Sequence, residues 1–102
     1  MRILVASNST SKRTDYFIKA GRSLGADTCF VTYDELSAVL PDCRDTVVKL
    51  EPPVFREADF RKYNLLCEEY RSLLSRLTDT DKSESVHFLN EPAAILCALD
   101  KV

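Results

Sequence analysis

Short apolar runs rich in β-branched residues alternate along the chain with segments of helical spacing, and this alternation limits the possible folds. The runs expected to form strands are Arg2 to Ser7, Thr28 to Thr32, Thr46 to Leu50 and Val86 to Leu89. Strands separated by helices form βαβ units, which have right-handed crossovers and parallel strands. Ile3 to Ala6 is apolar throughout rather than alternating, which predicts a central strand covered on both faces.

The first two segments between these strands are expected to be helical. The apolar face of the first helix comprises Phe17, Ala20, Gly21 and Leu24. Ser11 or Thr14 is expected to cap its start, and Gly25 to end it. Tyr33 to Leu40 predicts one or two further helical turns, which Pro41 ends.

The longest helix is predicted over Asp59 to Leu77. The strand before it must end at Pro52-Pro53, because proline cannot donate a hydrogen bond to a neighbouring strand. The apolar stripe of this helix comprises Phe60, Tyr63, Leu66, Cys67, Tyr70, Leu73, Leu74 and Leu77. A charged loop from Asp79 to Ser85 follows, and the last helix begins at Asn90-Glu91-Pro92. The sequence therefore predicts one α/β domain over residues 1–102, Rossmann-like and three-layered, with a parallel sheet of about four strands.

Composition excludes several classes of function. The chain has 102 residues, 45% of them hydrophobic, and its 14 basic and 16 acidic residues are interspersed to a net charge of −2. Without a basic stripe, nucleic acid is not an expected partner. The early apolar run, Ile3 to Ala6, is far shorter than a signal peptide or a membrane span requires, so we expect a cytoplasmic protein without a membrane partner.

Four cysteines are present, namely Cys29, Cys43, Cys67 and Cys97. They form no CxxC pair, and only one histidine is available to complete a metal site, so no structural zinc is expected. Three of the four fall in apolar periodic segments, which predicts buried thiols in a reducing compartment.

In open parallel sheets the ligand crevice lies beyond the carboxyl ends of the strands, where the strand order reverses. The segments that reach this edge are Ser7 to Thr14, Tyr33 to Glu35, Glu51 to Phe55 and Asn90 to Pro92. These segments are therefore the first place to look for function.

The turn at residues 7–13 contains no glycine, which excludes both the dinucleotide-binding fingerprint and the P-loop. It holds four hydroxyl side chains and two cations beside a helix start, where unpaired amides favour an anion such as a carboxylate or phosphate. Ser7, Asn8 and Ser9 are therefore candidate substrate-binding residues. A solvated polar turn closed by a capping Thr14 explains the same residues equally well.

No catalytic residue can be named from the sequence. A response-regulator receiver domain would need acidic residues after the first strand and an aspartate ending the third, whereas the chain has Ser7-Asn8 and Glu51-Pro52 there. His87 lies within a strand and lacks an obvious partner, which favours a structural role over a general base. Asp34 and Glu35 could hold a ribose hydroxyl, or simply begin a helix with favourable charge.

Three motifs, in their order along the chain, resemble those of a known family. They are Val47 to Pro53, the long helix with Tyr63 and Tyr70, and Phe88 to Ile95 followed by Asp100-Lys101. Together they resemble the N-terminal domain of ATP-grasp enzymes, most closely the prokaryotic glutathione synthetase type. In that family the third strand ends in an acidic-Pro-Pro turn, and the fourth ends in Asn-x-Pro before a helix that closes on an acidic residue and a lysine. The resemblance spans nearly the whole chain and is strongest from Val47 onward.

The resemblance implies roles for particular residues. Glu51, Pro52 and Pro53 match the turn that faces the acceptor substrate, and Asn90, with Pro92, matches the turn that shapes the domain junction. We count Asn90 with the candidate substrate-binding residues. Lys101 matches a lysine that contacts the nucleotide in several members of the family. Helix capping by Asn90 and strand termination by the prolines explain these residues structurally as well.

The resemblance also implies that catalysis lies elsewhere. In the family the acidic-Lys pair marks the start of the ATP-grasp domain proper, and ATP and Mg²⁺ are bound mainly by the domains that follow. This chain is therefore expected to carry no cofactor, metal ion or catalytic residue of its own. The first turn of this chain has no glycine and in this differs from many members of the family. The resemblance therefore does not identify a substrate for that turn.

The leading hypothesis is an N-terminal, substrate-side domain of a ligase that activates a carboxylate as an acyl phosphate and joins it to an amine or thiol. Its expected partners are the remaining ATP-grasp domains and a small carboxylate or amino-acid substrate, and a homodimer is compatible with this. The alternative is a stand-alone, non-catalytic module for ligand binding or protein interaction, and a third class is a flavodoxin-like carrier. An excised ligase domain should expose an apolar patch near Asn90 to Val102.

Overall fold

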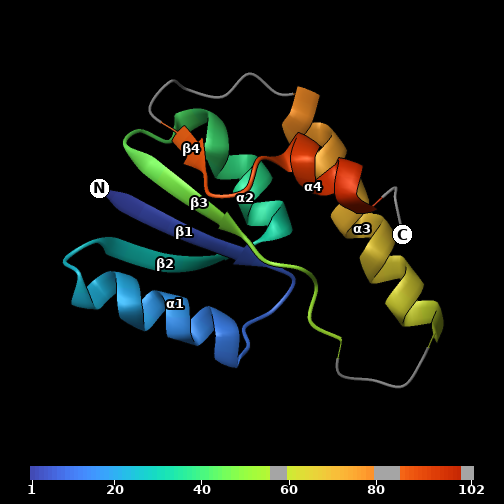
Figure 1. The fold of residues 1–102 in the computed structure, drawn as a ribbon, viewed down its shortest axis with the longest axis horizontal. Helices are drawn as coiled ribbons and strands as arrows, with labels where there is room; N and C mark the ends of the chain where they lie inside the picture. Colours follow the sequence, from blue (N-terminus) through green and yellow to red (C-terminus); the bar gives the residue numbers. More distant parts are fainter. Residues whose placement is uncertain (56–59, 80–85, 100–102) are drawn as a thin grey trace.

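The computed structural model describes residues 1–55, 60–79 and 86–99. The elements in order are β1 (Arg2–Ser7), α1 (Lys12–Ser23), β2 (Asp27–Thr32), α2 (Tyr33–Val39), the 3-10 helix η1 (Leu40–Asp42), β3 (Thr46–Leu50), α3 (Phe60–Asp79), β4 (Val86–Phe88) and α4 (Pro92–Leu99). The four strands are all parallel and lie in the order β2-β1-β3-β4 (Figure 1). The predicted α/β fold with a parallel sheet of four strands is confirmed.

β1 is an interior strand, as its continuous apolar run predicts. Val5 pairs with Phe30 of β2 on one side and with Lys49 of β3 on the other. Leu4, Val5 and Ala6 have no exposed surface. A run without polar residues suits this position because both faces of the strand are covered.

Helices on both faces of the sheet make the three layers. On one face, Leu4 of β1 and Val48 of β3 belong to a core that also includes residues of α2 and α3. On the other face, α1 contacts β1 and β2. α3 contacts α2 and α4, and Figure 1 shows α3 and α4 side by side near the carboxyl ends of the strands.

The ends of α1 follow the sequence signals closely. Thr14 N–H donates to Ser11 Oγ at 3.3 Å, and Ser11 N–H donates to Thr14 Oγ1 at 2.7 Å, so both candidate caps take part in one capping box. Gly25 follows the helix with a φ of 85°, a left-handed conformation that glycine adopts without strain. Leu24, predicted to be on the apolar face, is 88% exposed, because it caps the helix rather than belonging to its last turn.

Pro41 does not end the second helical segment directly. α2 ends at Val39, and η1 continues the turn with Pro41 inside it. A proline is tolerated there because the first residues of a helix need no backbone N–H donor.

The predicted apolar stripe of α3 is only half right. Tyr70, Leu73, Leu74 and Leu77 are buried, but Tyr63 is 48% exposed and Cys67 is exposed too. The apolar residues keep helical spacing along the whole of α3, yet only those in the second half of the helix belong to the core. Asp59 lies outside the described residues, as do residues 80–85 of the predicted loop, and Asp79 is the last residue of α3.

The prediction of buried thiols is wrong for two cysteines. Cys43 is buried and Cys29 half-buried, whereas Cys67 and Cys97 are exposed, and all four are free. The error arises because α3 and α4 each leave part of their apolar surface uncovered. Among the residues that the structure describes, no helix has both the length and the apolar character needed to cross a membrane.

Candidate functional site

The order of the strands reverses between β1 and β3. The chain leaves β1 toward β2 at one edge and leaves β3 toward β4 at the other edge. Adjacent connections that diverge in this way open a crevice at the carboxyl ends of the two strands. Ser7 ends β1 and Glu51 directly follows β3, so both lie at this point.

The ends of β1 and β3 are tied together by side chains. Asn8 Nδ2 donates to the Val54 carbonyl at 3.0 Å, and Val54 N–H donates to Asn8 Oδ1 at 2.7 Å. Ser7 Oγ donates to the Pro52 carbonyl at 3.2 Å. These bonds give Ser7 and Asn8 a structural role, which is to hold the turn after β3 in place.

Ser9, the third candidate of the first turn, makes a long hydrogen bond of 3.5 Å from its hydroxyl to the Thr10 carbonyl. The amide N–H of Thr14 is already occupied by the capping box. The helix start therefore offers fewer unpaired donors to an anion than the sequence suggests. Ligand binding by Ser7, Asn8 and Ser9 stays a prediction.

Glu51 brings a buried carboxylate to the crevice. Its side chain is only 5% exposed, and its Oε1 lies 3.1 Å from Lys49 Nζ, while its Oε2 lies 3.7 Å from Arg13 Nη1. The Lys49 ammonium also lies 5.0 Å from the centre of the Phe17 ring. A buried carboxylate needs such partners because the loss of hydration would otherwise cost several kcal/mol.

The two positive charges do not satisfy this carboxylate fully. Oε1 is buried and forms an ion pair with Lys49 Nζ at 3.1 Å rather than a regular hydrogen bond. The 3.7 Å contact to Arg13 is also too long for a hydrogen bond. Glu51 is therefore held by ion pairs, and the oxygen that faces Lys49 is closed to solvent.

Glu51 also lines a cavity of about 360 Å³. Its walls are Arg13 and Phe17 of α1, Lys49 and Leu50 of β3, Glu51 and Pro52 of the following turn, Tyr70 of α3, Asn90 after β4 and Ile95 of α4. Three residues predicted from the sequence, Glu51, Pro52 and Asn90, therefore meet in one cavity. Pro53 is not among the residues that line it.

The sequence did not place the basic and aromatic residues of this cavity in a common site. Lys49 and Glu51 are two residues apart at the end of a strand, a spacing that puts side chains on one face. A cation and an acid at that spacing in an otherwise apolar run signal a buried pair and could have been noticed. Arg13 and Tyr70 carry no such signal, because only the packing of α1 and α3 brings them to Glu51.

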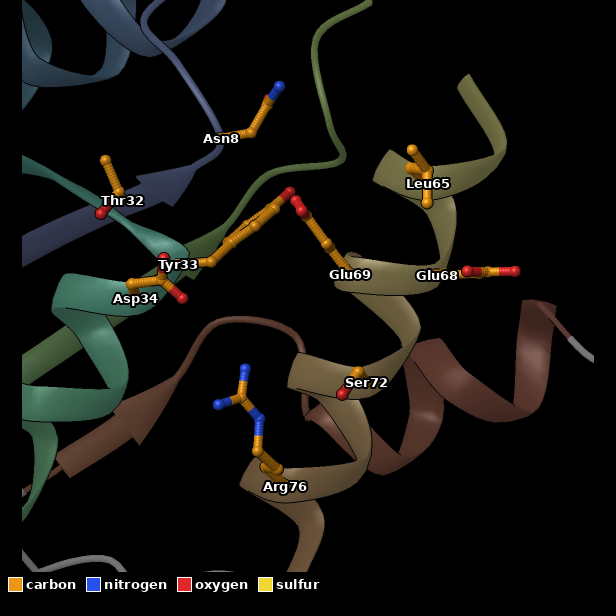
Figure 2. Close-up of a pocket in the computed structure, with 9 residues that line it drawn as sticks. All are labelled: Asn8, Thr32, Tyr33, Asp34, Leu65, Glu68, Glu69, Ser72 and Arg76. Carbon is orange, nitrogen blue, oxygen red and sulfur yellow. The ribbon is translucent and has the colours of Figure 1, made fainter. Parts of the chain in front are cut away.

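A second, larger cavity of about 490 Å³ lies on the α2–α3 side of the sheet. Its lining residues are Asn8, Thr32, Tyr33, Asp34, Leu65, Glu68, Glu69, Ser72 and Arg76. Figure 2 shows Tyr33 and Glu69 pointing toward each other, with Glu68 pointing away. Its acidic side chains are exposed, so the smaller cavity with the buried Glu51 is the stronger candidate site.

The acidic pair after β2 has divided roles. Thr32 accepts a hydrogen bond from Glu35 N–H at 3.2 Å and donates one to Glu35 Oε1 at 3.1 Å, which closes the start of α2. The helix-start interpretation therefore accounts for Glu35. Asp34 is exposed and lines the larger cavity.

Two buried tyrosines line the cavities, Tyr33 the larger one and Tyr70 the smaller one. The Tyr33 hydroxyl donates to the Glu51 carbonyl at 2.6 Å, and its ring stacks on Tyr70 with centres 5.6 Å apart. Burial raises the pKa of Tyr33 well above its ordinary value, and burial followed by the Glu51 charge raises the pKa of Tyr70. Both phenols therefore stay neutral at physiological pH, and the Tyr33 hydroxyl acts as a donor.

These shifts predict loss of stability in alkali. Above pH ~10 the tyrosines of the unfolded chain lose protons while Tyr33 and Tyr70 keep theirs, so the free energy of unfolding falls as pH rises. The expected slope is at most about 1.4 kcal/mol per pH unit for each tyrosine. Denaturant titrations from pH 8 to 11 should show a shallower fall for Tyr33→Phe than for Tyr16→Phe, whose ring is 69% exposed. Equal slopes for the two variants would contradict the raised pKa.

Metal and nucleotide binding concern three further observations. No group of three or more His, Cys, Asp or Glu side chains in ranges 1–55, 60–79 and 86–99 could hold a metal ion. His87 is exposed on β4. Lys101, the candidate nucleotide-binding residue, lies outside the described residues.

Comparison with known proteins returned no match, whether to a family model, to a curated protein or to a solved structure.

Proposed function

We propose that this chain is the N-terminal, substrate-side domain of an ATP-grasp ligase and is not catalytic by itself. The observation that carries the proposal is the meeting of Glu51, Pro52 and Asn90 at one cavity. These residues were singled out by their match to two separate motifs, one after β3 and one after β4. Their common position at the crevice of an α/β sheet is where such a fold binds small molecules.

The parent enzyme would activate a carboxylate as an acyl phosphate and join it to an amine or thiol. The resemblance places ATP and Mg²⁺ mainly in the domains that follow, and the turn after β1 of this chain has no glycine for a phosphate to approach. The proposal therefore assigns ATP and Mg²⁺ to other domains of the parent. This chain contributes walls of the acceptor pocket, which position a substrate and exclude water.

Helix α4 supports a role within a larger protein. Its sequence, PAAILCAL, contains no charged or polar residue other than a thiol. Ile95, Leu96 and Leu99 pack on the core, but Ala93, Ala94, Cys97 and Ala98 are exposed, and Leu89 just before the helix is 62% exposed. A helix that is apolar all round is normally buried in a larger assembly. We infer that the following ligase domain covers this side of α4.

A cytoplasmic location belongs to the same proposal. It is supported by four free cysteines, two of them exposed, which remain reduced in that compartment. ATP as co-substrate would be available there too.

The test is to sequence the gene across codon 102. Its full product is then assayed for phosphate release from ATP, with pooled amino acids as acceptors. The expected result is an ATP-grasp reading frame and phosphate release that depends on an acceptor. Lys101→Ala in that product should weaken ATP use, whereas Lys62→Ala, on the exposed surface of α3, should not. A stop codon after Val102 would reject the ligase and leave a binding module that uses the same cavity.

A further inference from the structure

The segment after β3 joins the ends of β3 and β1 without belonging to a helix or a strand. Residues 51–55 lie outside every element of secondary structure, and they include the consecutive prolines Pro52 and Pro53. Each proline fixes its own φ and favours extended backbone in the residue before it. We call Pro52 to Phe55 the strap. Because two prolines stiffen it, the strap should move as one piece.

One end of the strap is fixed at Glu51. The Glu51 N–H donates to the Ala6 carbonyl at 2.9 Å, which extends the pairing of β3 with β1 by one residue. The Glu51 carbonyl accepts a hydrogen bond from the Tyr33 hydroxyl at 2.6 Å, and the Glu51 carboxylate is ion-paired with Lys49. Glu51 is therefore held in the sheet, and a movement of the strap begins at Pro52.

Side chains at the end of β1 hold the strap closed. Asn8 Oδ1 accepts a hydrogen bond from Val54 N–H at 2.7 Å, and Asn8 Nδ2 donates to the Val54 carbonyl at 3.0 Å. The Asn8 amide therefore pairs with both backbone groups of Val54, as a residue of a neighbouring strand would. Ser7 Oγ adds a hydrogen bond of 3.2 Å to the Pro52 carbonyl.

The strap buries little apolar surface. Pro52 is exposed, the other three residues of the strap are half-buried, and none of the four belongs to the buried core. The Phe55 ring makes a T-shaped contact with the Tyr63 ring at 5.3 Å between centres, and Tyr63 is 48% exposed. A segment with few buried apolar contacts opens at a lower free energy than the core does.

The closed strap occupies polar groups that a ligand at the end of β1 would use. Both polar atoms of the Asn8 amide and the Ser7 hydroxyl bond to the strap. Ser7 and Asn8 lie where the strand order reverses, which is where open parallel sheets bind ligands. Asn8 also lines the larger cavity, and Pro52 lines the smaller one. A ligand that bonds to the Asn8 amide must therefore displace Val54.

We propose that the strap opens as a unit by releasing Val54 from Asn8, while Glu51 stays in the sheet, and that the closed strap blocks Ser7 and Asn8. Opening exposes an amide with a free donor and a free acceptor at the end of β1. The closed chain is then a self-occupied form of this crevice. The inference concerns this chain alone and is independent of whether its parent is a ligase.

The experiment measures hydrogen–deuterium exchange of single backbone amides by NMR, on the chain without any ligand. The two amides compared are Val54 N–H, which bonds to Asn8, and Glu51 N–H, which bonds to Ala6. After correction for intrinsic rates, we expect Val54 to exchange at least about tenfold faster than Glu51. Low concentrations of urea should accelerate exchange at Glu51 and leave Val54 nearly unchanged, because a local opening exposes little surface.

Variants test whether Asn8 is the residue that holds the strap. Asn8→Ala removes both hydrogen bonds to Val54 and should accelerate Val54 exchange by at least about tenfold, the scale of one or two lost hydrogen bonds. Exchange at Glu51 should change only as much as the stability of the whole chain does. Ser9→Ala is the matched control, because the Ser9 hydroxyl makes only a long bond of 3.5 Å to the Thr10 carbonyl, and it should leave Val54 exchange unchanged.

Two results would overturn the inference. Equal protection of Val54 and Glu51, with the same response to urea, would show that the strap opens only when the chain unfolds. A Val54 rate that Asn8→Ala leaves unchanged would show that Asn8 does not hold the strap. The urea comparison needs no variant, so it decides even if Asn8→Ala does not fold. Neither measurement involves ATP, so failure of this inference is distinguished from failure of the ligase.

Discussion

Replacing Leu73 with alanine is expected to lower the free energy of unfolding by about 2–5 kcal/mol. Leu73 has no exposed surface and lies in the core that α3 shares with β1 and β3. The substitution removes buried methyl groups and leaves a cavity that a close-packed interior fills only in part. Chemical denaturation followed by circular dichroism measures the loss.

Leu65→Ala is the matched control, because it makes the same chemical change in the same helix. Leu65 is 59% exposed, so its replacement should change the free energy of unfolding by no more than about 0.5 kcal/mol. Equal losses for the two variants would show that the first half of α3 is as well packed as the second. That result would contradict the half-buried stripe described above.

Replacing Gly21 with alanine is expected to destabilise the chain, although alanine favours helices. A Cβ at Gly21 would overlap the Thr28 hydroxyl and lie 3.0 Å from Thr28 Cβ and Cγ2. Thr28 is 1% exposed, and its hydroxyl donates to the Ala26 carbonyl at 3.2 Å, so the side chain has little room to move. Overpacking of this kind costs about 1–3 kcal/mol, which outweighs the gain of about 1 kcal/mol in helix propensity. Thermal or denaturant unfolding measures the net loss.

A double-mutant cycle separates this clash from a general effect on α1. Thr28→Ala removes the hydroxyl and the methyl group that a Cβ at Gly21 would meet, so Gly21→Ala should cost less in that background than in the parent. If the cost of Gly21→Ala is the same in both backgrounds, the close approach of α1 to β2 is not its cause.

The candidate site was only partly visible in the sequence. Glu51 and Asn90 could be singled out because motifs after consecutive strands end at the same edge of a parallel sheet. Arg13, Lys49 and Tyr70 could not, since their meeting depends on how α1 and α3 pack around the end of β3. The roles of Ser7 and Asn8 were also hidden, because hydrogen bonds to residues 52 and 54 join segments far apart in the chain.

The sequence by itself determined the elements, their order and the parallel sheet, because hydrophobic period and capping residues are local properties. Thr46–Leu50 and the capping box at Ser11 are examples. Only the tertiary structure decided which apolar faces are covered. The stripe of α3 keeps one period throughout, yet Tyr70 is buried and Tyr63 is half exposed, because burial depends on where the neighbouring elements end. The same is true of the carboxylate at Glu51, whose missing hydrogen bond arises from the three-dimensional arrangement of Lys49 and Arg13 around it.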